Sequence, residues 1–200
     1  MIAAALVMLF AGNAQAQLGV NFGYAPQTTS NTINNKVSTS EMPGFFAGVN
    51  YNMALTHGLG LSIGVDGRYN TKTTKETVLS ATATTKETQL LIDVPVLFNF
   101  GLTLGEATTL SVFFGPTFTY ALKGNTNYSE NVLNTSTDYN WYGENADLKQ
   151  FDILATAGAS LRYHDFRLFG GYRMGLLDIS KSDKCKSNTS GLFVGLGYVL

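Results

Sequence analysis

Few residues in this chain have the type and spacing that catalysis needs. The chain has two histidines, His57 and His164, and a single cysteine, Cys185. Asp165 follows His164 directly, but no nucleophile lies at a spacing that would complete a catalytic set. Two histidines are also too few ligands for a zinc site. The sequence therefore predicts a protein that is not an enzyme and that needs neither a metal nor a cofactor.

Acidic residues gather in a polar segment at 122–149, but they do not form a calcium-binding loop. Their spacing differs from the alternating ligand positions that such a loop requires; they are Glu130, Asp138, Glu144 and Asp147. A phosphate-binding glycine loop is not indicated either, because the glycines alternate along expected strands and precede no expected helix. With one cysteine, the chain forms no internal disulfide bond.

The same polar segment combines aromatic side chains with Asn, Ser and Thr. The aromatic residues are Tyr128, Tyr139, Trp141 and Tyr142. Aromatic and small polar residues together are typical of adaptable recognition surfaces, so we expect a loop that recognises sugars or proteins. The alternative is a loop that caps the fold, with its aromatic rings packed on each other or on a membrane surface.

The elements that position these residues show a period of two. From Leu90 to Phe100, for example, apolar residues alternate with a second set that includes Gln89, Asp93 and Asn99. This pattern predicts strands with one apolar face and one polar or small face. Eight such runs are expected, at residues 17–25, 43–54, 59–70, 88–102, 108–121, 150–163, 166–178 and 190–200.

The connections between the expected strands alternate strictly between short and long. The short ones cover residues 55–58, 103–107 and 164–165, and the long polar ones cover 26–42, 71–87, 122–149 and 179–189. This alternation places all long connections at one end, as in outer-membrane barrels. Strands of about ten residues can cross the membrane at a tilt, and closure leaves no unpaired edge in lipid. The sequence predicts an all-β fold, an eight-stranded antiparallel up-and-down transmembrane β-barrel over residues 17–200.

Composition agrees with a surface that faces lipid. Charged residues make up 14% of the chain, against roughly 25% in ordinary soluble domains. The net charge of −1 gives no indication of a nucleic-acid partner. Aromatic residues lie at the ends of the expected strands, as expected for girdles at both membrane surfaces; they are Tyr24, Tyr69 and Tyr120 at the long-loop end, and Phe100, Tyr163 and Phe166 at the short-turn end.

Charged residues of the expected strands lie on the face opposite the apolar stripe. By parity they point into the barrel; they are Asp66, Arg68, Asp93, Asp152, Arg162, Arg167 and Arg173. Side chains just fill the interior of an eight-stranded barrel, and an unpaired buried charge is costly. We therefore expect Asp66, Arg68, Asp93 and Arg173 to meet near mid-barrel, with Asp93 against an arginine. Such a network either plugs the lumen or lines a narrow ion path.

The first sixteen residues have the pattern of an export signal. Residues 2–12 are apolar but too few to span a membrane, and Ala14-Gln15-Ala16 matches a cleavage site. We expect a signal peptide at 1–16, with Gln17 as the first mature residue; an apolar first strand or buried helix is the alternative. No Lys or Arg precedes Lys36, so we expect the true translation start to lie upstream.

The segment Leu90-Leu91-Ile92-Asp93-Val94-Pro95-Val96-Leu97 resembles the Leu-x-x-Pro-Leu-Leu type of segment in the outer-membrane β-barrel family typical of Bacteroidetes, which includes PorT-like proteins. The Gly-aromatic segments 19–24 and 195–198 are similar too. The resemblance, to small barrels of the OmpA/OmpX type, implies an outer-membrane location and eight strands. It implies little about mechanism, because most members have no assigned activity. Leu200 departs from the terminal Phe that barrel assembly machinery often recognises.

Several functions are compatible with these features. The first is a non-enzymatic outer-membrane barrel, in contact with lipid, whose long extracellular loops bind cell-surface glycan or protein ligands. The others are a component of a secretion or assembly complex, a small porin-like pore, a lipid-modifying enzyme, and a soluble ligand-binding barrel of the lipocalin type. The soluble barrel would need a polar outside and an apolar lumen, which is the reverse of the pattern in the sequence.

Overall fold

The structure, a computed structural model, describes residues 16–33, 35–56, 58–78, 81–105, 107–130, 135–143, 146–182 and 185–200. The expected signal peptide, apart from Ala16, lies outside these residues, and so do His57 and Glu144. Within the described ranges, no helix is both long and apolar enough to cross a membrane.

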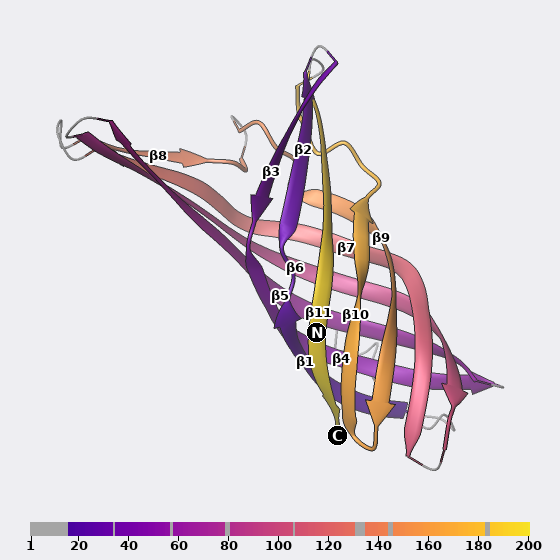
Figure 1. Cartoon of the computed structure of the whole chain (residues 1–200). Coiled ribbons are helices and arrows are strands. Elements are labelled where there is room, and N and C mark those ends of the chain that lie inside the picture. Colours follow the sequence, from indigo (N-terminus) through magenta and orange to yellow (C-terminus); the bar gives the residue numbers. More distant parts are fainter. Residues whose placement is uncertain are drawn as a thin grey trace.

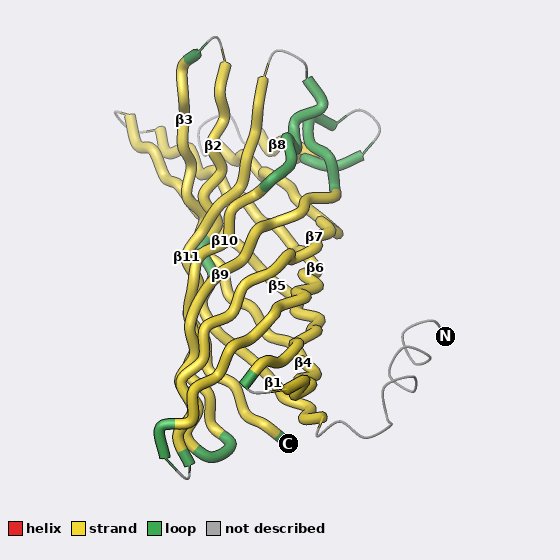
Figure 2. Tube along the Cα trace, turned by 90° about the vertical axis from the view of Figure 1, so that its right-hand side faces the viewer, coloured by secondary structure: helices red, strands yellow, loops and turns green. Residues whose placement is uncertain are grey.

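Eight strands close into an antiparallel barrel, which confirms the predicted fold class. The described residues form β1 (Ala16–Tyr24), β2 (Gln27–Ile33), β3 (Lys36–Met42), β4 (Gly44–Thr56), β5 (Leu59–Val78), β6 (Ala81–Thr103), β7 (Thr108–Glu130), β8 (Thr135–Asn140), β9 (Phe151–Tyr163), β10 (Phe166–Gly175) and β11 (Cys185–Val199). The ring runs β1-β4-β5-β6-β7-β9-β10-β11, and β1 pairs with both β4 and β11. Figures 1 and 2 show the ring from two sides.

Much of the sequence expected to form long loops is in strands. The segment 26–42 contains the hairpin β2–β3, in which β2 pairs with β11. Strands β5, β6 and β7 continue well beyond the barrel, and β8 pairs with the outer part of β7. These extensions are rich in Thr, whose branched side chain favours strands, but both faces are polar and no period of two is visible. In Figure 1 they sweep away from the upright hairpin β2–β3.

The opposite end of the barrel has the short turns that the sequence predicts. The turn between β9 and β10 has two residues, and His164 adopts a φ of 51° there. The His164 N–H donates to the carbonyl of Ala107, 2.9 Å away, in the neighbouring turn. The C-terminus also lies at this end, where the Leu200 N–H donates to the carbonyl of Leu18 at 2.8 Å.

Apolar side chains cover the outside of the barrel. Phe22, Phe45 and Leu192 are each exposed over more than half of their surface, whereas polar residues of the barrel strands such as Asp93 are buried inside. Aromatic pairs lie at the two ends of this belt, Tyr24 with Phe45 and Phe166 with Tyr198. This arrangement suits lipid outside and a polar lumen inside, and it excludes the soluble ligand-binding barrel.

Two rows of phenylalanine and glycine cross the interior. In each row, two neighbouring glycines lie between two phenylalanines in the strand register. One row is Phe46, Gly23, Gly195 and Phe169, and the other is Phe113, Gly158, Gly171 and Phe193. The rings lie over the glycines: a Cβ atom at Gly158 would be 2.5 Å from Phe113 Cζ, and one at Gly171 would be 2.9 Å from Phe193 Cζ. Glycine is therefore needed at these positions for the aromatic rings to fit inside.

Candidate functional site

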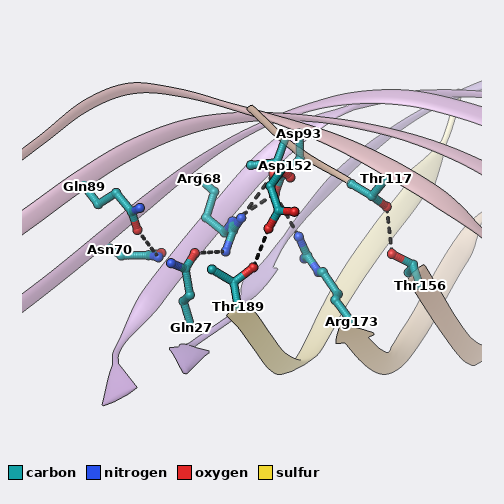
Figure 3. A network of polar contacts seen from close by, with 11 residues as sticks. Gln27, Arg68, Asn70, Gln89, Asp93, Thr117, Asp152, Thr156, Arg173 and Thr189 are labelled. Atoms are coloured by element: carbon teal, nitrogen blue, oxygen red, sulfur yellow. Dashed lines mark hydrogen bonds and ion pairs between the residues drawn. The ribbon is translucent and has the colours of Figure 1, made fainter. Parts of the chain in front are cut away.

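A buried carboxylate holds the middle of the lumen together. Asp93 on β6 is fully buried. The Arg68 Nε donates to its Oδ2 at 2.9 Å, and the Arg173 Nη1 donates to the same oxygen at 2.8 Å. The Thr119 hydroxyl donates to Oδ1 at 2.7 Å. We call these four residues the Asp93 network, part of which is drawn in Figure 3. Because β10 is not a neighbour of β6 in the ring, Arg173 reaches across the lumen.

Further polar contacts extend the Asp93 network toward the end of the barrel that carries the strand extensions, here called the outer end. The Arg68 Nη1 donates to Gln27 Oε1 at 2.9 Å, which ties the network to β2. Beside it, the Asn70 amide donates to Gln89 Oε1 (Figure 3). The Gln89 Nε2 in turn donates to the hydroxyl of Tyr142 at 2.6 Å.

On the other side, the guanidinium of Arg173 lies over the ring of Phe193, 4.7 Å from its centre. The ring of Phe46 is 5.8 Å from the same guanidinium. Arg173 is therefore paired with a carboxylate and also stacked on aromatic rings.

The other charged residues expected in the lumen lie outside the Asp93 network. Asp66 is buried opposite Asp93 in the register of β5 and β6, and we expected it to join the network. It forms no ion pair among the described residues, because Arg68 and Arg173 bind Asp93 instead. Asp152 accepts the hydroxyl of Thr189 at 2.7 Å. Nearer the short turns, two arginines donate to amide side chains, Arg162 to Gln17 and Arg167 to Asn21.

The Asp93 network divides the space inside the barrel. An inner cavity of about 390 Å³ opens at the short-turn end, where Arg162 and Arg167 lie on its wall. A second cavity of about 430 Å³, the outer cavity, lies at the end of the strand extensions. Smaller spaces of about 60, 20 and 10 Å³ lie among the side chains of the Asp93 network and its neighbours. The side chains of the Asp93 network thus lie between the two large cavities.

Three of the four aromatic residues expected to form a recognition loop line the outer cavity. They are Tyr139, Trp141 and Tyr142, whereas Tyr128 lies on β7 and is not part of the lining. The Trp141 Nε1 donates to the Thr126 hydroxyl at 2.8 Å. Tyr142 is buried against Leu91 and Ala121, so it closes the outer mouth of the lumen. Of the two alternatives from the sequence, the position of Tyr142 fits capping, whereas recognition by Tyr139 and Trp141 stays a prediction.

The outer cavity also contains polar residues that the sequence did not single out. Gln27, Gln89 and Ser187 lie on its wall. Gln89 could have been found, because parity places it on the inward face of its strand. Gln27 and Ser187 could not, because they belong to segments that were expected to be loops.

Hydrogen bonds fix the connections around the outer cavity. The hydroxyl of Tyr139 donates to Asp147, and this bond raises the pKa of Tyr139. The carboxylate of Asp178 accepts backbone N–H groups of Ser187 and Ser180, each at 2.9 Å, and these bonds hold the pKa of Asp178 below its ordinary value. No cluster of three or more residues able to hold a metal ion occurs in the described ranges.

The sequence model of the family described as "Outer membrane protein beta-barrel domain" matches residues 10–181. This chain belongs to that family. An outer-membrane barrel is the architecture that the apolar belt and the closed ring also indicate. No curated protein matches the chain.

Several solved structures are similar to this outer-membrane barrel. The attachment invasion locus protein Ail of Yersinia pestis, in complex with the heparin analogue sucrose octasulfate, is 16% identical over 92% of this chain and 99% of that one, with a TM-score of 0.46. Neisserial surface protein A is 9% identical over 90% and 96%, with a TM-score of 0.43. The N-terminal β-barrel domain of Pseudomonas aeruginosa OprF is 14% identical over 93% and 100%, with a TM-score of 0.34.

Proposed function

We propose that this outer-membrane barrel acts at the cell surface, through its outer end, as a non-enzymatic interaction protein. The observation that supports this most is the contrast between the two parts of the lumen. The Asp93 network closes the middle, so transport through the barrel is not favoured. The outer end, by contrast, has a cavity of about 430 Å³ and strand extensions beyond the barrel.

The proposal includes the orientation of the barrel. Outer-membrane barrels place their tight turns in the periplasm and their long connections outside the cell. The turn at His164–Asp165 is then periplasmic, and the outer cavity opens to the exterior. The proposal also includes cleavage after Ala16, so that the mature protein begins at Gln17. Membership of the Bacteroidetes-type, PorT-like subgroup is a further part, supported by the segment Leu90 to Leu97.

Cysteine labelling in intact cells tests the orientation. Cys185 is the only cysteine of the chain, and it lies on the wall of the outer cavity with its side chain partly exposed. A maleimide on a polyethylene glycol chain too large for general porins should label Cys185 in intact cells. The matched control is Asp165→Cys in a Cys185→Ser background, which should be labelled only after the outer membrane is permeabilised. The reverse pattern would contradict the proposal.

Conductance separates this function from a narrow pore. The purified protein in planar bilayers should give no steady channels, because Arg68, Asp93 and Arg173 fill the lumen. Steady single-channel currents from the wild-type protein would favour the pore instead.

A further inference from the structure

The outer cavity has a rigid aromatic wall. The ring of Trp141 packs edge-on against Tyr142, with ring centres 6.5 Å apart. The polar atoms of both rings are already engaged, Trp141 with Thr126 and Tyr142 with Gln89. A Cβ atom at Gly124 would come within 2.8 Å of either ring, so the backbone of β7 supports them closely. Tyr142 is itself buried, so the side chain that offers aromatic surface to the cavity is Trp141, which is partly exposed and held in place by these contacts.

A buried hydroxyl group on the same cavity has no partner. Ser187 is 1% exposed and lines the outer cavity, but its Oγ atom forms no hydrogen bond within the described residues. A buried polar group without a partner costs free energy, and a bound ligand that supplies one removes this cost. Side-chain amides of Gln27 and Asn31 and the hydroxyl of Ser40 also lie on the wall. Amides and hydroxyls both donate and accept, as sugar hydroxyls do.

The charges around the cavity do not favour an anionic ligand. Two carboxylates, Glu87 and Asp147, belong to the wall, and no Lys or Arg does among the described lining residues. Lys72 reaches the rim only through Ser40, with its Nζ 3.4 Å from the hydroxyl. A phosphorylated or sulfated ligand would meet these carboxylates, whereas an uncharged ligand would not be repelled.

We propose that the outer cavity binds an uncharged saccharide of one or two rings, stacked on Trp141 and hydrogen-bonded to Ser187. The volume of about 430 Å³ is within the usual range for small-ligand sites. Aromatic surface at Trp141, amide and hydroxyl groups, and a described lining without Lys or Arg together match a neutral sugar better than a charged or wholly apolar molecule. This inference rests on the proposed function, because it names the ligand class for the surface-exposed end.

Tryptophan fluorescence of the full-length protein in detergent micelles tests the inference directly. Trp141 is the only tryptophan in the chain, so its emission reports on the proposed site alone. The probes are sucrose, maltose, cellobiose and diacetylchitobiose at millimolar concentration, with sucrose octasulfate as the anionic counterpart of sucrose. We expect at least one neutral sugar to change the emission saturably and the octasulfate to bind more weakly than any neutral sugar that binds.

Two variants separate a specific site from a general effect on the fold. Ser187→Ala removes the hydroxyl group and should raise the Kd for that sugar about fivefold, the effect of one hydrogen bond. Thr39→Ala removes a hydroxyl from the exposed hairpin β2–β3, away from the lining, and should leave the Kd unchanged. Both variants should keep the gel mobility of the folded barrel.

Three results would overturn the saccharide site. They are no saturable response to any neutral sugar, tighter binding of the octasulfate, or an unchanged Kd in Ser187→Ala. None of them bears on the labelling of Cys185 in intact cells. Failure of the sugar site and failure of the surface function are therefore distinguishable.

Discussion

Asp93 shows how strongly a single buried residue can organise a barrel interior. Its carboxylate accepts hydrogen bonds from side chains on three other strands, Arg68 on β5, Thr119 on β7 and Arg173 on β10. A buried ion pair contributes little compared with a well-packed apolar core, but removing one partner leaves the other charges without compensation. Here two guanidinium groups would lose the same carboxylate.

We therefore predict that Asp93→Leu destabilises the barrel by about 3–5 kcal/mol. The midpoint of urea unfolding in detergent, followed by Trp141 emission, measures the change. Asp138→Ala on the exposed strand β8, which removes a bond to Asn127, is the control and should shift the free energy of unfolding by less than about 0.5 kcal/mol. Equal midpoints for both variants would refute the central role of Asp93.

Residue-level prediction from the sequence succeeds for the inward direction and for the pairing of Asp93 with an arginine, but it is wrong for Asp66. Period-two parity predicts that Arg68, Asp93 and Arg173 point inward, and all three are buried. Parity also led to the expectation that Asp66 joins them. That Asp66 stays outside the network depends on how the strands are staggered across the lumen, which the parity of a single strand does not specify.

At the scale of elements, the barrel strands are predictable because lipid outside and polar side chains inside impose a period of two. The outer extensions of β5, β6 and β7 face water on both sides, so this constraint ends at the membrane. The sequence signal ends there too, although the strands continue to Val78 in β5 and to Glu130 in β7. The hairpin β2–β3 was missed for the same reason.

The phenylalanine–glycine rows give a test at this scale. We predict that Gly158→Ala destabilises the barrel by about 1–3 kcal/mol, because its Cβ atom would lie 2.3 Å from the carbonyl oxygen of Gly170 and 2.5 Å from Phe113. Gly67→Ala on the outward face is the matched control, since the nearest atom is the Ala47 oxygen at 3.8 Å. The control should be neutral or slightly stabilising. Urea unfolding of the two variants provides the comparison, and equal losses would exclude a role for close packing.

At the scale of the whole molecule, ring closure follows from the membrane itself. Lipid offers no hydrogen bonds to an open sheet edge, so eight amphipathic strands with alternating connections have one stable arrangement. We predict that the unboiled protein migrates faster than the boiled protein in detergent gels, and that it fractionates with the outer membrane. A soluble protein with a single gel mobility would contradict the closed barrel.

The phenylalanine–glycine rows have a further consequence, for the assembly of the barrel. Lipid solvates any apolar side chain equally well, so the outer belt barely distinguishes the correct strand alignment from one displaced by two residues. The interior does distinguish them. Displacing β9 by two residues would place Thr156 or Ser160 where Gly158 lies beneath Phe113. Close packing inside the barrel therefore favours the correct strand alignment, and the residues that set it do not contact the membrane.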